Sequence, residues 1–228
     1  MIYYRLTRCI ELLRVGDFPQ IQTHDYAGND NDLNCVLDQP FHPLPLKYKV
    51  PIGFLSMKAK RTDFISDSAA IFGLLVSDRV KLFLEKYRLR GITFVPTSIQ
   101  QRGNSYPYWY AIPIDKGYDL IDIEKTRIVQ FADLMKKNSV ATIQPENIEE
   151  TTNLLDYSDP TLRDLTVYHI SQTQLKPNLQ VDLFCLAKFN NNTGIYVSEH
   201  LYEALVTEGF SGLSIDKEFC LVSPDPIS

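Results

Sequence analysis

The sequence predicts an α+β fold made mainly of antiparallel sheet, with two strand–helix–strand brackets and a loop-rich N-terminal portion. Three observations support this prediction. One segment recurs later in the chain, the region between the two copies is rich in aromatic and β-branched residues, and the N-terminal portion is interrupted by proline and glycine. With 228 residues and a hydrophobic fraction of 44%, the chain is long enough to bury a substantial core.

The N-terminal portion, residues 1–66, is expected to pack on the main domain rather than to fold alone. Residues 2–13 alternate weakly between polar and apolar and fit either a first strand or a short helix. The prolines within residues 40–45 force an extended path, because each one fixes its own φ and disfavours helix at the residue before it. The main α+β domain is therefore placed at residues 67–228.

An internal repeat aligns residues 73–94 with residues 194–215 without gaps. Each copy predicts a short apolar strand, a serine N-cap followed by an acidic residue, an amphipathic helix, and a glycine at which the chain returns into another strand. The capping serines are Ser77 and Ser198. We expect these two brackets to build the core.

Between the two copies, the sequence predicts an antiparallel pair of strands over residues 91–99 and 106–112, joined by a turn at 101–104. Pro107 lies in the second of these strands. Since proline cannot donate to the hydrogen-bond ladder, it indicates that this strand lies at a sheet edge or begins there.

The segment 137–160 is polar and acidic, and it is predicted to be a surface excursion that carries a short helix after Pro145. Apolar stretches at residues 167–170 and 183–189 predict further strands that lead into the second copy of the repeat.

Charge and cysteine usage bear on partners and location. The net charge is −5 and the pI is near 5.4, so a basic partner is favoured, and neither nucleic acid nor a membrane is expected as a partner. No segment is apolar for long enough to span a bilayer. The scattered cysteines lack a C-x-x-C pair, which fits reduced thiols and predicts a cytoplasmic protein. They are Cys9, Cys35, Cys185 and Cys220.

Motifs for the common enzyme chemistries are missing from the sequence. It contains no G-x-G-x-x-G, P-loop, G-x-S-x-G or H-E-x-x-H motif. Each histidine lacks a partner at metal-ligand spacing. The histidines are His24, His42, His169 and His200. No catalytic residue, metal site or cofactor is therefore predicted.

The aromatic strand offers candidate binding residues. Strand alternation places Tyr106, Tyr108 and Tyr110 on one face and Trp109 on the other. Either these rings fill the core, or the exposed set forms a recognition patch, because Trp and Tyr dominate binding hot spots. Tyr106, Tyr108 and Trp109 are the candidates for such a patch.

An acidic segment follows that strand. If it is extended, Asp122 and Glu124 share one face, with Asp119 near its start. These carboxylates could meet basic side chains of a partner, or they could simply belong to a solvated strand edge. They are too few for a dedicated calcium or magnesium site. We take them as candidate partner-binding residues.

Several motifs in residues 72–216 resemble one bacterial family, first catalogued as a domain of unknown function and now grouped with the immunity proteins of polymorphic toxin and contact-dependent or type VI secretion systems. The motifs are G-x-x-V-S-D-x-V-x-x-F-L-E at 73–85, R-G-I-T-F-V-P at 90–96, the aromatic strand, D-x-x-D-x-E-K-T at 119–126, and I-Y-V-S-E-x-L-x-x-A-L at 195–205 followed by G-x-S-G-L at 209–213.

This resemblance implies a non-enzymatic protein that binds a cognate toxin domain in the cytoplasm and blocks it. It carries no catalytic residues over to this chain. Two other classes stay open: a small-molecule or peptide-binding sensor, which a deep apolar cavity would favour, and a carboxylate-based hydrolase, which strongly shifted carboxyl pKa values would favour.

Overall fold

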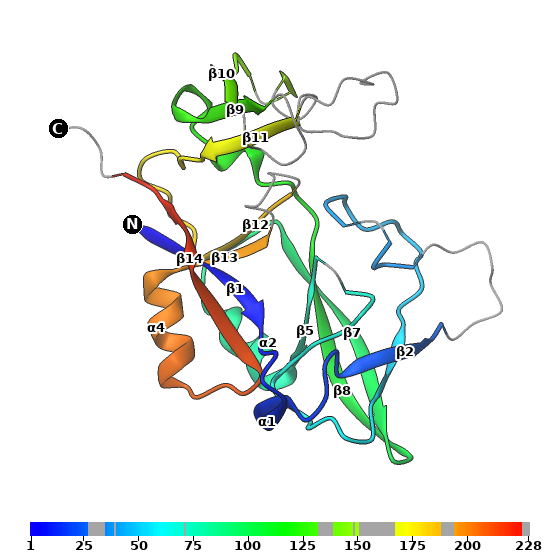
Figure 1. Cartoon of the computed structure of the whole chain (residues 1–228). Coiled ribbons are helices and arrows are strands. Elements are labelled where there is room, and N and C mark those ends of the chain that lie inside the picture. The colour runs from blue at the N-terminus through cyan, green and yellow to red at the C-terminus, as the bar shows by residue number, and fades with distance from the viewer. Residues whose placement is uncertain are drawn as a thin grey trace.

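β-Sheet makes up most of the fold, with short helices in a minority (Figure 1). The computed structural model describes residues 1–26, 35–38, 40–70, 72–131, 139–147, 149–150, 167–187 and 194–224. These residues form three sheets in which most neighbouring strands are antiparallel. The predicted mixed α+β class, rich in antiparallel sheet, is confirmed.

The first sheet is built from both ends of the chain. It has five strands in the order β14 (Leu213–Val222), β1 (Ile2–Arg8), β13 (Gly194–Ser198), β12 (Leu183–Leu186) and β6 (Leu89–Arg90). Strand β1 pairs antiparallel with β14 on one side and with β13 on the other. The N-terminal portion, residues 1–66, therefore supplies an interior strand of this sheet.

The second sheet has six strands and curls around a core of its own. Their order is β2 (Ile21–Asp25), β3 (Ile52–Leu55), β7 (Ile92–Gln101), β8 (Asn104–Pro113), β5 (Leu74–Ser77) and β4 (Phe64–Ile65). Strands β7 and β8 form the predicted antiparallel pair. Between them Arg102 and Gly103 have positive φ angles of 52° and 78°, as a two-residue hairpin turn matched to strand twist requires.

Strand β8 lies between β7 and β5, so it is not an edge strand over its whole length, as one alternative of the prediction had it. Pro107 is nevertheless accommodated by the register. Pairing with β5 extends only from Ala111 to Tyr108, whereas Pro107 lies opposite Ser98 of β7. At Pro107 the strand thus has a neighbour on one side only, and one missing N–H group there does not interrupt a ladder.

The third sheet, at the top of Figure 1, holds β10 (Ser139–Ile143), β9 (Arg127–Phe131) and β11 (Val167–Gln172) in that order. Strand β11 fits the strand predicted at 167–170. The excursion predicted at 137–160 includes β10, and residues 137–138, 148 and 151–160 of it lie outside the described part of the chain, which leaves most of the region after Pro145 without a description.

Each copy of the repeat contains a helix that begins at a serine. Helix α2 (Asp78–Leu84) follows β5, and helix α4 (Glu199–Thr207) follows β13. The Ser77 hydroxyl accepts a hydrogen bond from the Val80 N–H at 3.4 Å, and the Ser198 hydroxyl accepts one from the Leu201 N–H at 3.2 Å. Both helices direct apolar side chains into one core cluster, which joins the first two sheets.

Two aspartates tie the repeat copies to each other. Asp63, before β4, accepts a hydrogen bond from the Ser77 hydroxyl at 3.0 Å, and from the Ser211 N–H and hydroxyl at 3.0 and 2.8 Å. Ser77 caps α2, whereas Ser211 lies just beyond α4. One carboxylate therefore fixes the start of one helix against the exit from the other.

Asp182, before β12, makes the reciprocal link. Its carboxylate accepts hydrogen bonds from the Ser198 hydroxyl at 3.2 Å and from the Arg88 N–H and Nε at 3.0 and 3.2 Å. Ser198 caps α4, and Arg88 lies just beyond α2. Burial opposes the ionisation of Asp182, but the hydrogen bonds from Arg88 and Ser198 outweigh it and lower its pKa.

The substitution Asp182→Ala is expected to lower the free energy of unfolding by about 2 kcal/mol, because it leaves the buried Ser198 hydroxyl and the Arg88 N–H without their acceptor. Urea unfolding followed by circular dichroism measures the change. Glu203→Ala, at an exposed position of α4, is the matched control and should change stability by less than about 0.5 kcal/mol. Equal stabilities of the two variants would contradict the structural role of Asp182.

Candidate functional site

The six candidate residues predicted from the sequence fall into two groups in the structure. Asp119, Asp122 and Glu124 line one pocket. Tyr106, Tyr108 and Trp109 lie on β8, where alternate residues face opposite sides of the sheet. The acidic group is brought together by the fold, whereas the aromatic residues do not form one surface.

The acidic segment is not the strand that the sequence suggested. It forms two single-turn 3₁₀ helices, η1 (Tyr118–Leu120) and η2 (Ile123–Lys125). Gly117 starts η1 with a φ of 69°, and a Cβ there would lie 2.2 Å from the Cys185 carbonyl oxygen. This close approach of two backbones favours a turn over an extended strand and requires glycine.

Main-chain hydrogen bonds fix the acidic segment against the chain that follows β11. The Lys176 N–H donates to the Leu120 carbonyl at 2.9 Å, and the Asp122 N–H donates to the Gln174 carbonyl at 2.8 Å. Leu120 and Ile121 are buried in the core cluster under the first sheet. The backbone that carries the three carboxylates is therefore held from both sides.

The pocket has a volume of about 570 Å³ and an acidic, partly apolar lining. Its lining residues are Tyr118, Asp119, Ile121, Asp122, Ile123, Glu124, Glu146, Asn147 and Lys176. Four of these carry carboxylates and one carries an ammonium group. Glu146 comes from the segment after β10, far along the chain from Asp119, so the fold adds a fourth carboxylate to the three predicted ones.

Two of the four carboxylates already hold a cation. The Asp119 carboxylate lies 2.6 Å from an Arg90 Nη atom, and the Asp122 carboxylate lies 3.1 Å from the Lys125 Nζ. Within the described residues, Glu124 and Glu146 make no such ion pair. The pocket can therefore accept a positive group at these two carboxylates, while Tyr118, Ile121 and Ile123 can pack against its carbon stem.

The described part of the chain contains no group of three or more His, Cys, Asp or Glu side chains arranged to hold a metal ion. The carboxylates of Glu124 and Glu146 can pair with an organic cation, such as a lysine or arginine side chain.

The aromatic residues of β8 are mostly engaged within the protein. Tyr108 is buried, its hydroxyl donates to the Thr62 carbonyl at 2.7 Å, and burial raises its pKa. The Arg61 guanidinium lies 4.0 Å from the centre of the half-buried Tyr106 ring. On the other face, the Trp109 indole N–H donates to the Asp78 carboxylate. Tyr106 and Trp109 keep part of their ring area exposed.

A buried polar network appears that sequence reasoning missed. His24 was treated as isolated, yet its Nε2 lies 2.7 Å from an oxygen of Asp67. The other Asp67 oxygen accepts a hydrogen bond from the Tyr110 hydroxyl at 2.7 Å, and the Ala69 N–H donates to the first at 2.8 Å. His24 and Tyr110 are far from Asp67 in the chain, so no local spacing of residues predicts their contact with it.

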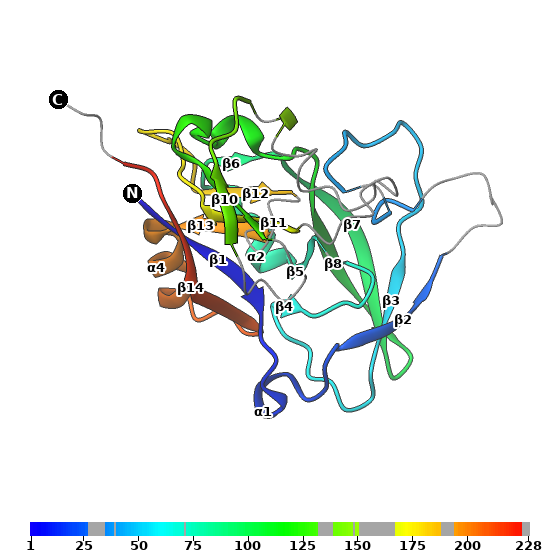
Figure 2. The same ribbon diagram turned by 45° about the horizontal axis from the view of Figure 1, so that its top comes forward.

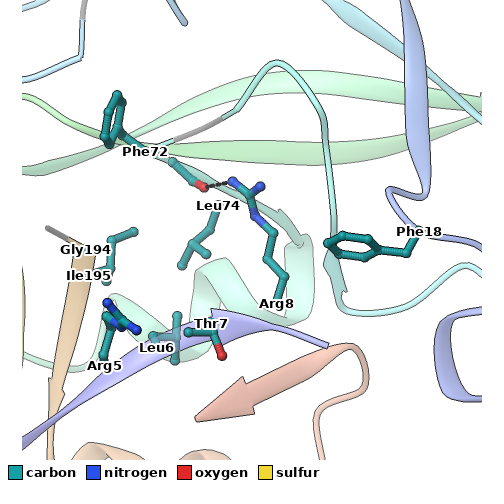
Figure 3. Close-up of a pocket in the computed structure, with 10 residues that line it drawn as sticks. Arg5, Leu6, Thr7, Arg8, Phe18, Phe72, Leu74, Gly194 and Ile195 are labelled. Carbon is teal, nitrogen blue, oxygen red and sulfur yellow. Dashed lines mark hydrogen bonds between the residues drawn. The ribbon is translucent and has the colours of Figure 1, made fainter. Parts of the chain in front are cut away.

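A second pocket, of about 410 Å³, lies where β1 meets the first residues of β5 and β13 (Figure 3). Arg5 and Arg8 are its charged lining residues, and most of the others are apolar. The Arg8 guanidinium points toward the Gly73 carbonyl, to which it donates at 2.8 Å, and it also donates to the Asp67 and Ala70 carbonyls. Burial lowers the pKa of Arg8.

No protein-family model matches the chain, and no curated protein matches it either. In the part of the chain that the structure describes, no helix is both long and apolar enough to cross a membrane. Function must therefore be inferred from the arrangement of the side chains.

The substitution Asp67→Asn is expected to lower the free energy of unfolding by about 3 kcal/mol at neutral pH, because one amide cannot replace a carboxylate that binds His24, Tyr110 and the Ala69 N–H. Chemical unfolding measures the loss, and Asp25→Asn at an exposed position of the adjacent strand β2 is the control.

The same variant should also change the acid dependence of stability. Burial opposes the ionisation of Asp67, but hydrogen bonds from His24 and Tyr110 outweigh it and lower its pKa. The contribution of Asp67 is thus present above the unfolded pKa of about 3.9 and is lost as pH falls through the lower folded-state value. An unfolding profile that falls equally steeply in Asp67→Asn below pH 4 would argue against this contribution.

Proposed function

We propose that this chain is a non-enzymatic immunity protein that binds a cognate bacterial toxin domain in the cytoplasm and neutralises it. The observation that carries the proposal is the acidic pocket, in which Glu146 joins Asp119, Asp122 and Glu124. The motif resemblance over residues 72–216 supports the same function, since the acidic segment is one of the matching motifs.

The pocket would receive a lysine or arginine side chain of the toxin domain. The aliphatic stem would pack on Tyr118, Ile121 and Ile123, and the charged head would reach Glu124 and Glu146. Charge-assisted hydrogen bonds of this kind are about twice as strong as neutral ones. A basic anchor buried in a pocket is a common form of binding hot spot, and its removal typically costs at least 2 kcal/mol.

The main chain around the acidic pocket is held by contacts within the protein, so the pocket would be preorganised for binding. The lining residue Ile121 is buried in the core, and the Asp122 N–H donates to the Gln174 carbonyl. The N–H of Glu146, another lining residue, donates to the Glu150 carboxylate at 2.7 Å. Little ordering entropy is therefore lost on association, which raises affinity. The net charge of −5 would also speed encounter with a basic domain.

The proposed scaffold for this pocket is a pair of strand–helix–strand brackets, one in each copy of the repeat. Their equivalence is supported by the serine caps Ser77 and Ser198, each bonded to an aspartate in the preceding strand segment. The aromatic candidates would act in two ways. Tyr106 and Trp109 would offer exposed ring area to the partner, while the buried Tyr108 would support the strand beneath them.

One observation favours a second candidate function, that of a small-molecule sensor. The pocket beside β1 combines an apolar lining with the guanidinium groups of Arg5, which pairs with Asp216 at 2.6 Å, and of Arg8, so a ligand with an apolar body and an anionic group that competes for these donors would fit it (Figure 3). Binding of such a ligand with no effect of the chain on any toxin would place this function first.

Co-expression with the toxic C-terminal domain encoded beside the gene tests the immunity function. The expected result is cell survival and a complex that co-purifies. Cell death without a complex would exclude that cognate pairing.

The double variant Asp122→Lys/Glu124→Lys is expected to weaken the complex at least about 100-fold, because it replaces attraction at the pocket by repulsion. Calorimetric titration of the purified domains measures the affinity. The control is Asp25→Lys/Glu203→Lys, which makes the same charge change at exposed positions elsewhere. If both double variants bind as tightly as the parent protein, the acidic pocket is not the contact.

A further inference from the structure

A cluster of exposed apolar side chains surrounds the short helix α1 (Leu12–Val15). We call residues 10–18 and 56–61 the α1 tip. Within it Leu13 is 90% exposed, and the other exposed apolar residues of the tip are Ile10, Leu12, Phe18 and Met57. Figures 1 and 2 both show α1 at the lower edge of the molecule and away from the third sheet; the turn between β7 and β8 also lies on this side.

The two segments of the α1 tip are held tightly together. The Lys60 N–H donates to the Val15 carbonyl at 2.7 Å, and Val15 itself is fully buried. Gly16 has a φ of 82°, and a Cβ at this position would lie 2.2 Å from the Lys58 carbonyl oxygen. Leu12 and Leu13 therefore project to solvent from a fixed backbone, while Val15 packs inward from the same helix.

A turn places Met57 beside this helix. The Ala59 N–H donates to the Ser56 carbonyl at 3.0 Å, which closes the turn, and the Ser56 hydroxyl donates to the Asp17 carboxylate. Met57 and Lys58 occupy the two central positions and are both exposed. An apolar side chain and a cation thus project together from the turn.

Charge in the α1 tip is opposite to that of the whole protein. The tip contains the cations Arg14, Lys58, Lys60 and Arg61 and the carboxylates Glu11 and Asp17, whereas the chain has a net charge of −5. The ammonium group of Lys60 donates to the Leu13 carbonyl at 2.7 Å, so a cation lies beside the most exposed leucine. Basic residues therefore border apolar ones.

The geometry points to peripheral docking of the α1 tip on an anionic lipid surface. Leu12, Leu13 and Met57 would enter the boundary between headgroups and acyl chains, and Lys58 and Lys60 would meet lipid phosphates. The tip projects at one end of the molecule, which suits a flat lipid surface. Carboxylates that lie more than about 8 Å from the lipid would repel it only weakly, because charges are screened over about that length at physiological ionic strength.

Docking of this kind needs no membrane-spanning segment, and it is independent of the acidic pocket. No membrane was expected as a partner from the sequence, because α1 is too short to show helical periodicity and the lysines beside it come from a different part of the chain. The contact would hold the protein at a membrane without crossing it.

Vesicle co-sedimentation of the full chain tests the docking. The protein is expected to bind phosphatidylcholine vesicles that contain phosphatidylglycerol, and to bind pure phosphatidylcholine at least about tenfold more weakly. Leu12→Ser/Leu13→Ser should abolish sedimentation, and Lys58→Glu/Lys60→Glu should weaken it at least about tenfold. The control Leu46→Ser removes a fully exposed leucine outside the tip and should leave binding unchanged.

Three outcomes would overturn the proposal: no binding to the anionic vesicles at low salt, equal binding by the parent protein and Leu12→Ser/Leu13→Ser, or loss of binding in the Leu46→Ser control. Light scattering after size exclusion tests a further outcome that would overturn the proposal. A concentration-dependent dimer that is lost in Leu12→Ser/Leu13→Ser would assign the tip to self-association. All substituted side chains are exposed, and thermal unfolding verifies that each variant is folded.

Discussion

The reciprocal bonding of Asp63 and Asp182 is the constraint on which the other features depend. Each carboxylate joins the N-terminus of one helix to the segment after the other helix. The two bonds together fix the relative position of β5 and β13, and β5 in turn fixes β8. Because residues 114–117 are all that separate β8 from the first acidic 3₁₀ helix, the position of the pocket depends in part on this pair of bonds.

Local features of the fold could be predicted from sequence, whereas long-range ones could not. Ser77 and Ser198 predict where their helices begin, because the capping hydrogen bond reaches only three residues along the chain. The interior place of β1 depends on pairing with strands near the other end of the chain. The acidic segment was expected to be a strand because its local pattern is apolar and acidic in alternation. The contacts that make it turn, which are the burial of Leu120 and Ile121 and the approach of the Cys185 backbone to Gly117, are tertiary and leave no local signal.

The candidate site shows the same division. Asp119, Asp122 and Glu124 could be found because they are close in sequence, and the fold does gather them. Glu146 and the contact of His24 with Asp67 involve residues distant in the chain, and only the structure reveals them. The acidic pocket is lined by segments that adjoin β9 and β10 of the third sheet in the chain, and α1 lies away from that sheet in Figure 1, so a protein resting on lipid through the α1 tip would leave these carboxylates facing solvent.

The exchange of partners makes the two repeat copies interdependent. Each helix cap is bonded to an aspartate that lies ahead of its own copy, and that aspartate also holds the exit of the other copy. Neither copy therefore has a complete set of partners within its own segment, and the contacts that order each helix form only when both halves of the chain are present.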